Sequence, residues 1–155
     1  MIYEPSSFQI FPITQLLPNF WLGNCGDAEK LSVENPLGIE EVINVCGLDY
    51  MKSSKITYTT CEINDGEEIP EESFWKIVNY AVQQYQSDKR VLIHCAAGMS
   101  RSAALAAAIM HVSGVMSFEE AQIFIKRRRP IVKPHFKVVG SIRKLLKLFP
   151  YDGSY

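Results

Sequence analysis

Residues 91–108 read VLIHCAAGMSRSAALAAA, and this stretch decides the fold. Val91, Leu92 and Ile93 in succession are typical of a strand buried on both faces, as in the middle of a parallel sheet. A short loop with a glycine follows, and Arg101 begins an alanine-rich segment that we interpret as a closely packed core helix. A buried strand that turns directly into a buried helix is a building unit of layered α/β folds.

The rest of the chain alternates between strands and helices on both sides of this stretch. Strands are predicted where β-branched or aromatic residues lie between turn residues, over Phe8–Ile13, Phe20–Gly23, Glu41–Cys46, Ile56–Ile63 and Arg90–Cys95. Apolar spacing and capping patterns predict helices over Asp27–Val33, Glu71–Ser87, Arg101–Ser113, Ser117–Arg128 and Phe136–Leu148. This order predicts an α/β fold whose central, mostly parallel twisted sheet of about five strands is flanked by helices.

This topology brings two polar positions together. Asp65 and Cys95 each follow the end of a predicted strand, and the helix over Glu71–Ser87 is the return path between them. Because strands joined by helical crossovers are parallel, their carboxyl ends meet at one edge of the sheet. We therefore expect Asp65 and Cys95 to share one crevice.

The loop from Cys95 to Arg101 has the composition of a phosphate cradle. Its glycine lets the backbone curl so that amide groups point inward, and the following helix adds the positive end of its dipole. Arg101 supplies a planar fork for two phosphate oxygens. We expect the phosphate to be bound by the loop residues Ala96, Ala97, Gly98, Met99, Ser100 and Arg101.

The same surroundings predict that Cys95 is ionised. A cysteine at a helix amino terminus beside a cation has a lowered pKa, which makes it a nucleophile at neutral pH. Ser102 lies one step beyond Arg101, where its hydroxyl can reach the thiolate. His94 is expected to support the loop through hydrogen bonds rather than to act as a base, since a thiolate that has already formed needs none.

These residues resemble a known signature. His94, Cys95, Gly98, Arg101 and Ser102 match the HCxxGxxRS pattern of the protein tyrosine phosphatase superfamily, and HCAAGMSRSAAL resembles its small, atypical dual-specificity phosphatases. The resemblance extends over residues 13–148 and includes LLPNFWLG, GIEEVINV and RRRPIVKP. It implies a single phosphatase catalytic domain over residues 1–155, with an ordered core over about 8–150, that uses no metal and no cofactor.

The resemblance also implies a mechanism. Cys95 would attack phosphorus while Arg101 and the loop amides hold the oxygens, and water would then hydrolyse the phosphocysteine. Asp65, by its likeness to the family's general acid, would protonate the leaving oxygen and later act as base. On the residues alone, Asp65 is equally well a turn aspartate before a glycine. Ser102 would ease the departure of the sulfur.

Three further residues carry weaker predictions. Some superfamily members form a protective disulfide with the nucleophile, which makes Cys46 a candidate redox partner of Cys95; the alternative is an inert core thiol. Arg129 is a candidate for receiving a second phosphate or an acidic peptide, against the simpler interpretation of solvated charge at a helix end. His135 stands where the family often has an asparagine that braces the catalytic loop, so that role is open here.

The composition argues against several other classes of protein. With 16 basic and 17 acidic residues the net charge is -1, which creates no global field for nucleic acid or an anionic membrane. The richest apolar run, residues 103–110, is too short to span a bilayer. The four cysteines form no CxxC pair, which argues against a zinc site and favours a reducing compartment. We expect a cytoplasmic protein, with the nucleus as a second location, and the oligomeric state is left open.

The predicted function is hydrolysis of phosphotyrosine and of phosphoserine or phosphothreonine in proteins. Two alternatives stay open: a phosphatase of a non-protein phosphomonoester (an RNA 5′ end, a phosphoinositide or a phosphosugar), and a phosphoprotein-binding module without catalysis. Ala96, Ala97 and Met99 add no lysine for a highly charged inositide head group. The presence of both Cys95 and Arg101 argues against an inactive relative.

Overall fold

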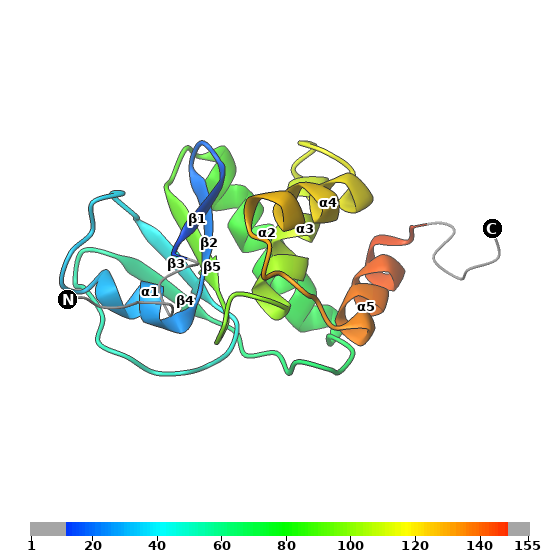
Figure 1. Cartoon of the computed structure of the whole chain (residues 1–155), viewed down its shortest axis with the longest axis horizontal. Coiled ribbons are helices and arrows are strands. Elements are labelled where there is room, and N and C mark those ends of the chain that lie inside the picture. Colours follow the sequence, from blue (N-terminus) through cyan, green and yellow to red (C-terminus); the bar gives the residue numbers. More distant parts are fainter. Residues whose placement is uncertain (1–11, 149–155) are drawn as a thin grey trace.

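The sheet is built around the strand predicted for its centre. The computed structural model describes residues 12–148, and in them five strands lie in the order β1-β2-β5-β3-β4 (Figure 1). Their bounds are β1 Thr14–Leu17, β2 Phe20–Gly23, β3 Glu41–Asn44, β4 Thr57–Thr60 and β5 Val91–His94. β2, β5, β3 and β4 run parallel, while β1 is antiparallel to β2. The predicted α/β fold with a mostly parallel sheet is therefore confirmed.

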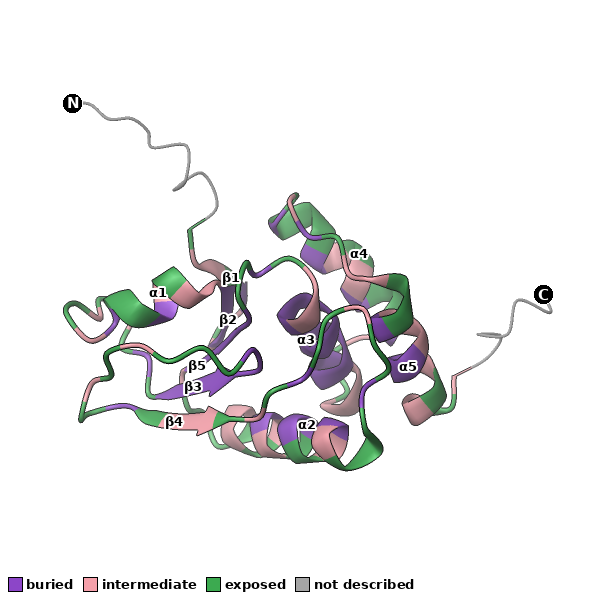
Figure 2. Cartoon of the chain, turned by 90° about the horizontal axis from the view of Figure 1, so that it is seen from below, coloured by how far each residue is buried: buried purple, intermediate pink, exposed green. Residues whose placement is uncertain are grey.

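Helices cover both faces of this sheet. Figure 2 shows α1 on one face of the strands and α2 on the other, with α3 on the side of α2 and α4 and α5 beyond it. α1, α2 and α3 contact the central strands, α4 packs on α3 and on β1, and α5 packs on α3. The bounds of the helices are α1 Cys25–Lys30, α2 Glu71–Gln86, α3 Arg101–Val112, α4 Phe118–Arg128 and α5 Phe136–Leu146.

The side chains of β5 explain why its sequence is apolar without interruption. Val91 and Ile93 belong to the large core shared with α2 to α5, whereas Leu92 belongs to the smaller core on the face of α1, with Trp21 and Val42. Successive side chains of a strand point to opposite faces, so a strand covered on both faces needs apolar residues at every position.

α3 is enclosed by the rest of the fold. All its residues from Ser102 to Met110 are buried, and it contacts α2, α4, α5 and two strands. Its alanines are small enough for these neighbours to approach closely in a densely packed interior. The amino end of α3, at Arg101, is therefore held in a fixed place relative to β5.

The first predicted strand is wrong at its last two residues. Residues 12 and 13 of the expected strand Phe8–Ile13 are not in a strand, and residues 8–11 lie outside the described residues, as do 149 and 150 of the expected ordered core. β1 instead occupies Thr14–Leu17, because a turn at Pro18–Asn19 folds this segment back on β2. Pairing with a neighbouring strand decided the position, and a single apolar run cannot show it.

The first helix begins earlier than predicted, at Cys25 rather than Asp27, and ends at Lys30 rather than Val33. Asn24 and Asp27 form a capping box: the Asp27 amide donates to Oδ1 of Asn24 (2.8 Å), and the Asn24 amide donates to Oδ2 of Asp27 (2.9 Å). The capping box predicted at the start of α4 is present.

Among residues 12–148, no helix is long and apolar enough to cross a membrane. Within the same residues there is no group of three or more histidine, cysteine, aspartate or glutamate side chains that could hold a metal ion.

Candidate active site

The loop between β5 and α3, residues 95–101, lies at a topological switch point of the parallel sheet. β5 lies between β2 and β3, so the connections after neighbouring strands leave on opposite sides of the sheet. Such a switch point opens a crevice beyond the carboxyl ends of the strands. Cys95 directly follows β5, and Arg101 begins α3.

Carbonyl groups of the 95–101 loop bond to the structure around it. The oxygen of Ala96 accepts a hydrogen bond from the amide of Cys25 at the start of α1 (3.1 Å). The oxygen of Met99 accepts one from the amide of Lys133, in the segment before α5 (2.8 Å). The amides of Gly98 and Ser100 bond instead to the sulfur of Cys95 inside the loop, where an anion can also accept from amide groups.

Cys95 is buried at the centre of this loop, with 2% of its surface exposed. Burial raises the pKa of the Cys95 thiol and is the largest influence on it. The hydroxyl of Ser102, 3.0 Å from Sγ, and the amides of Ser102, Gly98 and Ser100 lower it, and together they hold the pKa of Cys95 below its ordinary value. Since the thiolate is the reactive form of cysteine, the loop favours a nucleophile.

His94 holds the loop through a hydrogen-bond chain. Its Nδ1 lies 3.1 Å from the carbonyl oxygen of Cys95, and its Nε2 lies 2.7 Å from the hydroxyl of Tyr50. A carbonyl only accepts, so Nδ1 carries the proton and Nε2 accepts from Tyr50. Burial lowers the pKa of His94 and raises the pKa of Tyr50, which keeps the imidazole neutral and the phenol protonated. Nothing in the sequence pattern indicated Tyr50, because it lies in an irregular segment far from the motif.

Gly98 is required by its backbone and by its neighbours. Its φ is +67°, in the left-handed region that favours glycine. A Cβ atom there would lie 2.6 Å from the carbonyl oxygen of Gly23 and 2.7 Å from Nη2 of Arg129. Any side chain at this position would therefore push the loop away from β2.

Arg129 supports the loop from behind instead of facing solvent. It is 1% exposed, and its Nε donates to the oxygen of Gly98 (2.9 Å) while Nη1 donates to the oxygen of Pro12 (2.7 Å) and to Oγ1 of Thr14 (2.8 Å). The prediction that Arg129 receives a second phosphate or an acidic peptide is therefore wrong. A run of four basic residues did not show that one of them is turned inward.

Asp65 reaches the 95–101 loop through Ser100. The hydroxyl of Ser100 donates to Oδ1 of Asp65 (2.6 Å) and accepts from the amide of His135 (2.9 Å). Ser100 is also the residue before α3, where a serine hydroxyl usually caps the helix, but it makes no capping bond here. The two strand ends expected to meet thus do so, and the hydroxyl of Ser100 joins them. Sequence reasoning had assigned Ser100 only to the phosphate cradle.

His135 contacts the loop through its backbone and not through its ring. Its amide bonds Ser100, as described, while its Nδ1 accepts from the amide of Lys137 (3.1 Å) and so caps α5. The ring stacks on Phe136, with centroids 4.7 Å apart. The backbone amide of His135, and not its side chain, therefore braces the catalytic loop. Every residue other than proline has such an amide.

Arg101 leaves one donor without a protein partner. Its Nη1 donates to the carbonyl oxygen of Ile63 (3.1 Å), which fixes the side chain toward the end of β4. Its Nε is buried and has no hydrogen-bond partner among the described residues. A buried, unpaired nitrogen of a guanidinium is costly, and an anion that accepts from it removes that cost.

Cys46 lies just beyond β3, the strand next to β5. It is 6% exposed, and its Sγ donates to Oδ1 of Asn44 at 3.3 Å. The four cysteines, all in the described part of the chain, are free thiols. The pairing of Cys46 with Cys95 on oxidation stays a prediction.

Comparison with known proteins agrees with this geometry. A family model described as "Dual specificity phosphatase, catalytic domain" matches residues 20–147. The chain belongs to this family. Mouse dual specificity protein phosphatase 2 is 30% identical over 136 residues, which cover 84% of this chain and 42% of that protein. Human dual specificity protein phosphatase 7 is 30% identical over 142 residues, which cover 89% of this chain and 34% of that protein. The chain thus spans less than half the length of these curated relatives.

Solved structures of dual specificity phosphatases and related proteins share the fold. Human DUSP28 has a TM-score of 0.74 at 18% identity, covering 88% of this chain and 93% of that chain. The human tyrosine phosphatase-like serine/threonine/tyrosine-interacting protein has a TM-score of 0.77 at 23% identity, covering 88% and 96%. DUSP15 has a TM-score of 0.75 at 26% identity, covering 88% and 85%.

Proposed function

We propose that this chain is a protein phosphatase that hydrolyses phosphotyrosine and phosphoserine or phosphothreonine through a phosphocysteine intermediate. One observation carries the proposal: a single loop holds both a stabilised thiolate at Cys95 and, through the hydroxyl of Ser100, the carboxylate of Asp65. A nucleophile and a proton donor from two strand ends are thereby part of one hydrogen-bonded unit. Membership of the dual specificity phosphatase family supports the same reaction.

In the first step, Sγ of Cys95 forms a bond to phosphorus as the bond from phosphorus to the substrate oxygen breaks. The inward amides and the unpaired Nε of Arg101 bind the remaining phosphate oxygens and stabilise their negative charge in the transition state. Asp65 gives its proton to the leaving oxygen. Because Oδ1 accepts from Ser100, Oδ2 is the oxygen left for the transferred proton.

In the second step, water attacks the phosphocysteine. Asp65, now a carboxylate, accepts a proton from this water, and the bond between sulfur and phosphorus breaks. The electron pair returns to sulfur, where the hydroxyl of Ser102, 3.0 Å away, donates to the departing thiolate. Inorganic phosphate leaves, and both Cys95 and Asp65 are restored for the next turn.

Phosphorylated proteins are the substrate class that we favour. The loop positions Ala96, Ala97 and Met99 add no cation, which suits a singly phosphorylated side chain better than an inositide head group. Both curated relatives described above are named as protein phosphatases. A non-protein phosphomonoester remains the second candidate substrate. We place the reaction in a reducing compartment, the cytoplasm or the nucleus, because all four cysteines are free thiols.

Binding without turnover is the alternative from another class, since one similar structure belongs to a protein named as phosphatase-like and interacting. The joint presence of Cys95, Arg101 and Asp65 in one hydrogen-bonded site favours turnover. A module that only binds phosphate has no use for a carboxylate that is held beside the phosphate cradle by Ser100.

The test is turnover of aryl phosphates in the presence of a metal chelator, followed by phosphopeptides, phosphoinositides and 5′-phosphorylated RNA. We expect no turnover by Cys95→Ser, and a loss of about 10²–10⁴-fold by Asp65→Ala with poor leaving groups but much less with good ones. Glu34→Ala, at an exposed carboxylate between α1 and β3, is the control and is expected to keep activity.

Normal turnover by Cys95→Ser would overturn the mechanism. Equal losses for good and poor leaving groups in Asp65→Ala would remove the acid role. Turnover of an inositide or an RNA without turnover of any phosphopeptide would overturn the proposed substrate class.

A further inference from the structure

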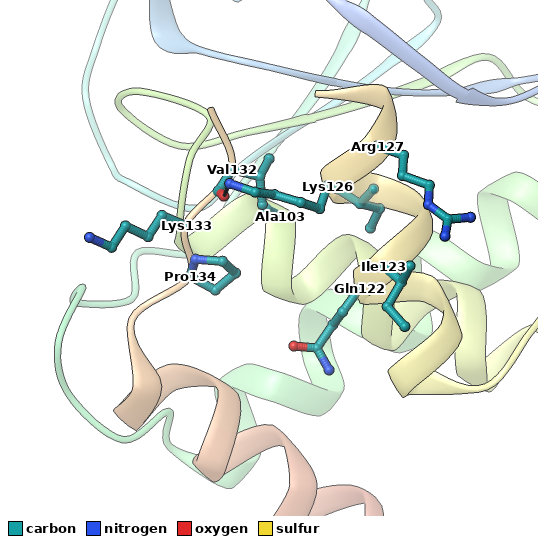
Figure 3. A pocket seen from close by; sticks show the side chains of 9 residues that line it. Ala103, Gln122, Ile123, Lys126, Arg127, Val132, Lys133 and Pro134 are labelled. Atoms are coloured by element: carbon teal, nitrogen blue, oxygen red, sulfur yellow. Dashed lines mark hydrogen bonds between the residues drawn. The ribbon is translucent and has the colours of Figure 1, made fainter. Parts of the chain in front are cut away.

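A groove lies between α4 and the wall segment, residues 129–135, whose Lys133 amide bonds to the 95–101 loop. It has a volume of about 520 Å³ and lies between Ile123 on α4 and Pro134 on that segment, with Ala103 of α3 on its floor (Figure 3). Ile125 and Val132 complete its apolar lining. Ile123 is 55% exposed, so an apolar side chain faces water at the open side of the groove.

The charged residues that line the groove are all cations. They are Lys126, Arg127 and Lys133, and the lining contains no aspartate or glutamate. Lys126 is engaged, because its Nζ donates to the oxygens of Pro130 and Val132, each at 2.7 Å, and so fixes the segment that forms one wall. Arg127 and Lys133 are exposed, and within residues 12–148 neither forms an ion pair.

The two exposed cations stand on opposite sides of the groove. Figure 3 shows Arg127 on the side of α4 and Lys133 on the far side of the wall segment, directed away from α4. The amide of Lys133 donates to the oxygen of Met99, and the Met99 side chain is 37% exposed at the surface of the catalytic loop. A substrate segment that leaves the 95–101 loop on the side of Met99 would meet Lys133 before the apolar groove and Arg127.

We propose that this groove docks an acidic segment of the phosphorylated protein substrate, with one apolar side chain between Ile123 and Pro134 and acidic side chains beside Arg127 and Lys133. The proposal rests on the function proposed above and deepens it, because it names a feature of the substrate outside the phosphorylated residue. Charge complementarity selects an acidic segment, and the apolar lining selects a protein side chain.

The same observations disfavour the other anionic macromolecules. An RNA backbone needs a row of cations and stacking surfaces, and the groove offers two free cations and no aromatic side chain. An anionic bilayer surface needs a broad basic face, whereas here the cations border a recess between two elements. A solvated cation that complements the dipole at the end of α4 would account for Arg127. It would not account for Lys133, which lies outside α4.

The experiment compares pairs of phosphotyrosine peptides that differ only outside the phosphotyrosine. One member carries Leu-Glu-Glu, placed before or after the phosphotyrosine at several spacings, and its partner carries Ser-Gln-Gln. The measured quantity is the ratio of kcat/KM values within each pair, which cancels any change in the chemical step. We expect the wild type to prefer the acidic, apolar member by about fivefold to tenfold at low salt, with the preference falling as salt rises.

Two double variants decide between docking and general charge effects. Arg127→Glu with Lys133→Glu is expected to reduce the ratio to about one or below, because the acidic side chains then meet like charges. Lys55→Glu with Lys89→Glu makes the same change in net charge at exposed lysines before β4 and β5, at the opposite edge of the sheet from Cys95, and is expected to keep the ratio. Ile123→Ser is expected to lower the ratio for the pair Leu-Gln-Gln and Ser-Gln-Gln, which differs only in the apolar side chain, and to keep the ratio for Ser-Glu-Glu against Ser-Gln-Gln.

The outcomes separate this inference from the proposed function. If the wild type turns over aryl phosphates but no phosphopeptide, the proposed function fails. If it turns over both members of every pair with equal kcat/KM, or if both double variants change the ratio alike, the docking site is overturned and the proposed function stands. The docking site would also be overturned if the wild type bound RNA or anionic vesicles and only the Arg127→Glu, Lys133→Glu variant lost this binding. The groove would then be a site for RNA or for a membrane surface.

Discussion

Replacing Ser102 with alanine tests the electrostatic origin of the nucleophile. The hydroxyl lies 3.0 Å from Sγ of Cys95, both groups are buried, and burial by itself raises the pKa of the thiol. Removing the hydroxyl leaves that effect less opposed, so the pKa of Cys95 must rise. A hydrogen bond to a charged group contributes about 1.5–3 kcal/mol, and one pKa unit corresponds to about 1.4 kcal/mol, which gives a rise of about 1–2 units.

The assay is the pH dependence of alkylation of Cys95 by iodoacetamide, followed by mass spectrometry. Below the pKa the rate follows the fraction of thiolate, so Ser102→Ala is expected to react about 10–100-fold more slowly there and to shift the midpoint upward. Ser113→Ala is the matched control. It removes a partly buried hydroxyl just beyond the other end of α3, where Oγ donates to the carbonyl oxygen of Ile109. A midpoint that does not move, or that moves down, refutes the reasoning.

Three further predictions follow from the loop. Ser100→Ala should reduce turnover about tenfold with poor leaving groups and less with good ones, because it releases Asp65 while the backbone amide at position 100 still stabilises the thiolate; a leaving-group series that shows equal losses would contradict this. Gly98→Ala should lower the free energy of unfolding by about 1–3 kcal/mol or more, from a left-handed backbone and a clash with the end of β2, and calorimetry that finds an unchanged Tm would exclude it. If Cys46 is the redox partner, peroxide should give a peptide linked to Cys95 that is absent from Cys46→Ser; without such a peptide, it is an inert core thiol.

Part of the fold was predictable because it depends on local patterns. The run Val91–Ile93 needs apolar neighbours on both faces, and this requirement placed β5 at the centre of the sheet. The capping box at Ser117 marked the start of α4 in the same way. The strand expected at Phe8–Ile13 is wrong at residues 12 and 13, and β1 follows them because its position depends on pairing with β2, which is a contact between two segments.

The residues of the candidate site also fall into those that local sequence reveals and those that act through contacts between distant segments. The cysteine, the arginine and the glycine of the loop were recognisable because their chemistry acts through adjacent backbone. The contribution of Ser100 was not, because its hydroxyl meets Asp65 across 35 positions of sequence and gives up the helix cap to do so. Tyr50 was missed and Arg129 was given the wrong role for the same reason, since each acts on the loop from another part of the chain.

By itself, the sequence predicted that a loop suited to phosphate, with a cysteine at its base, follows a buried strand. That result needed only backbone conformation and residue chemistry, and both are local. The tertiary structure alone decided which distant groups complete the site. It turned Arg129 inward behind Gly98, set Asp65 against Ser100, and left Lys133 and Arg127 exposed on the two sides of a groove. The physical reason is that a side chain's partners depend on which segments pack together, and packing is a property of the whole chain.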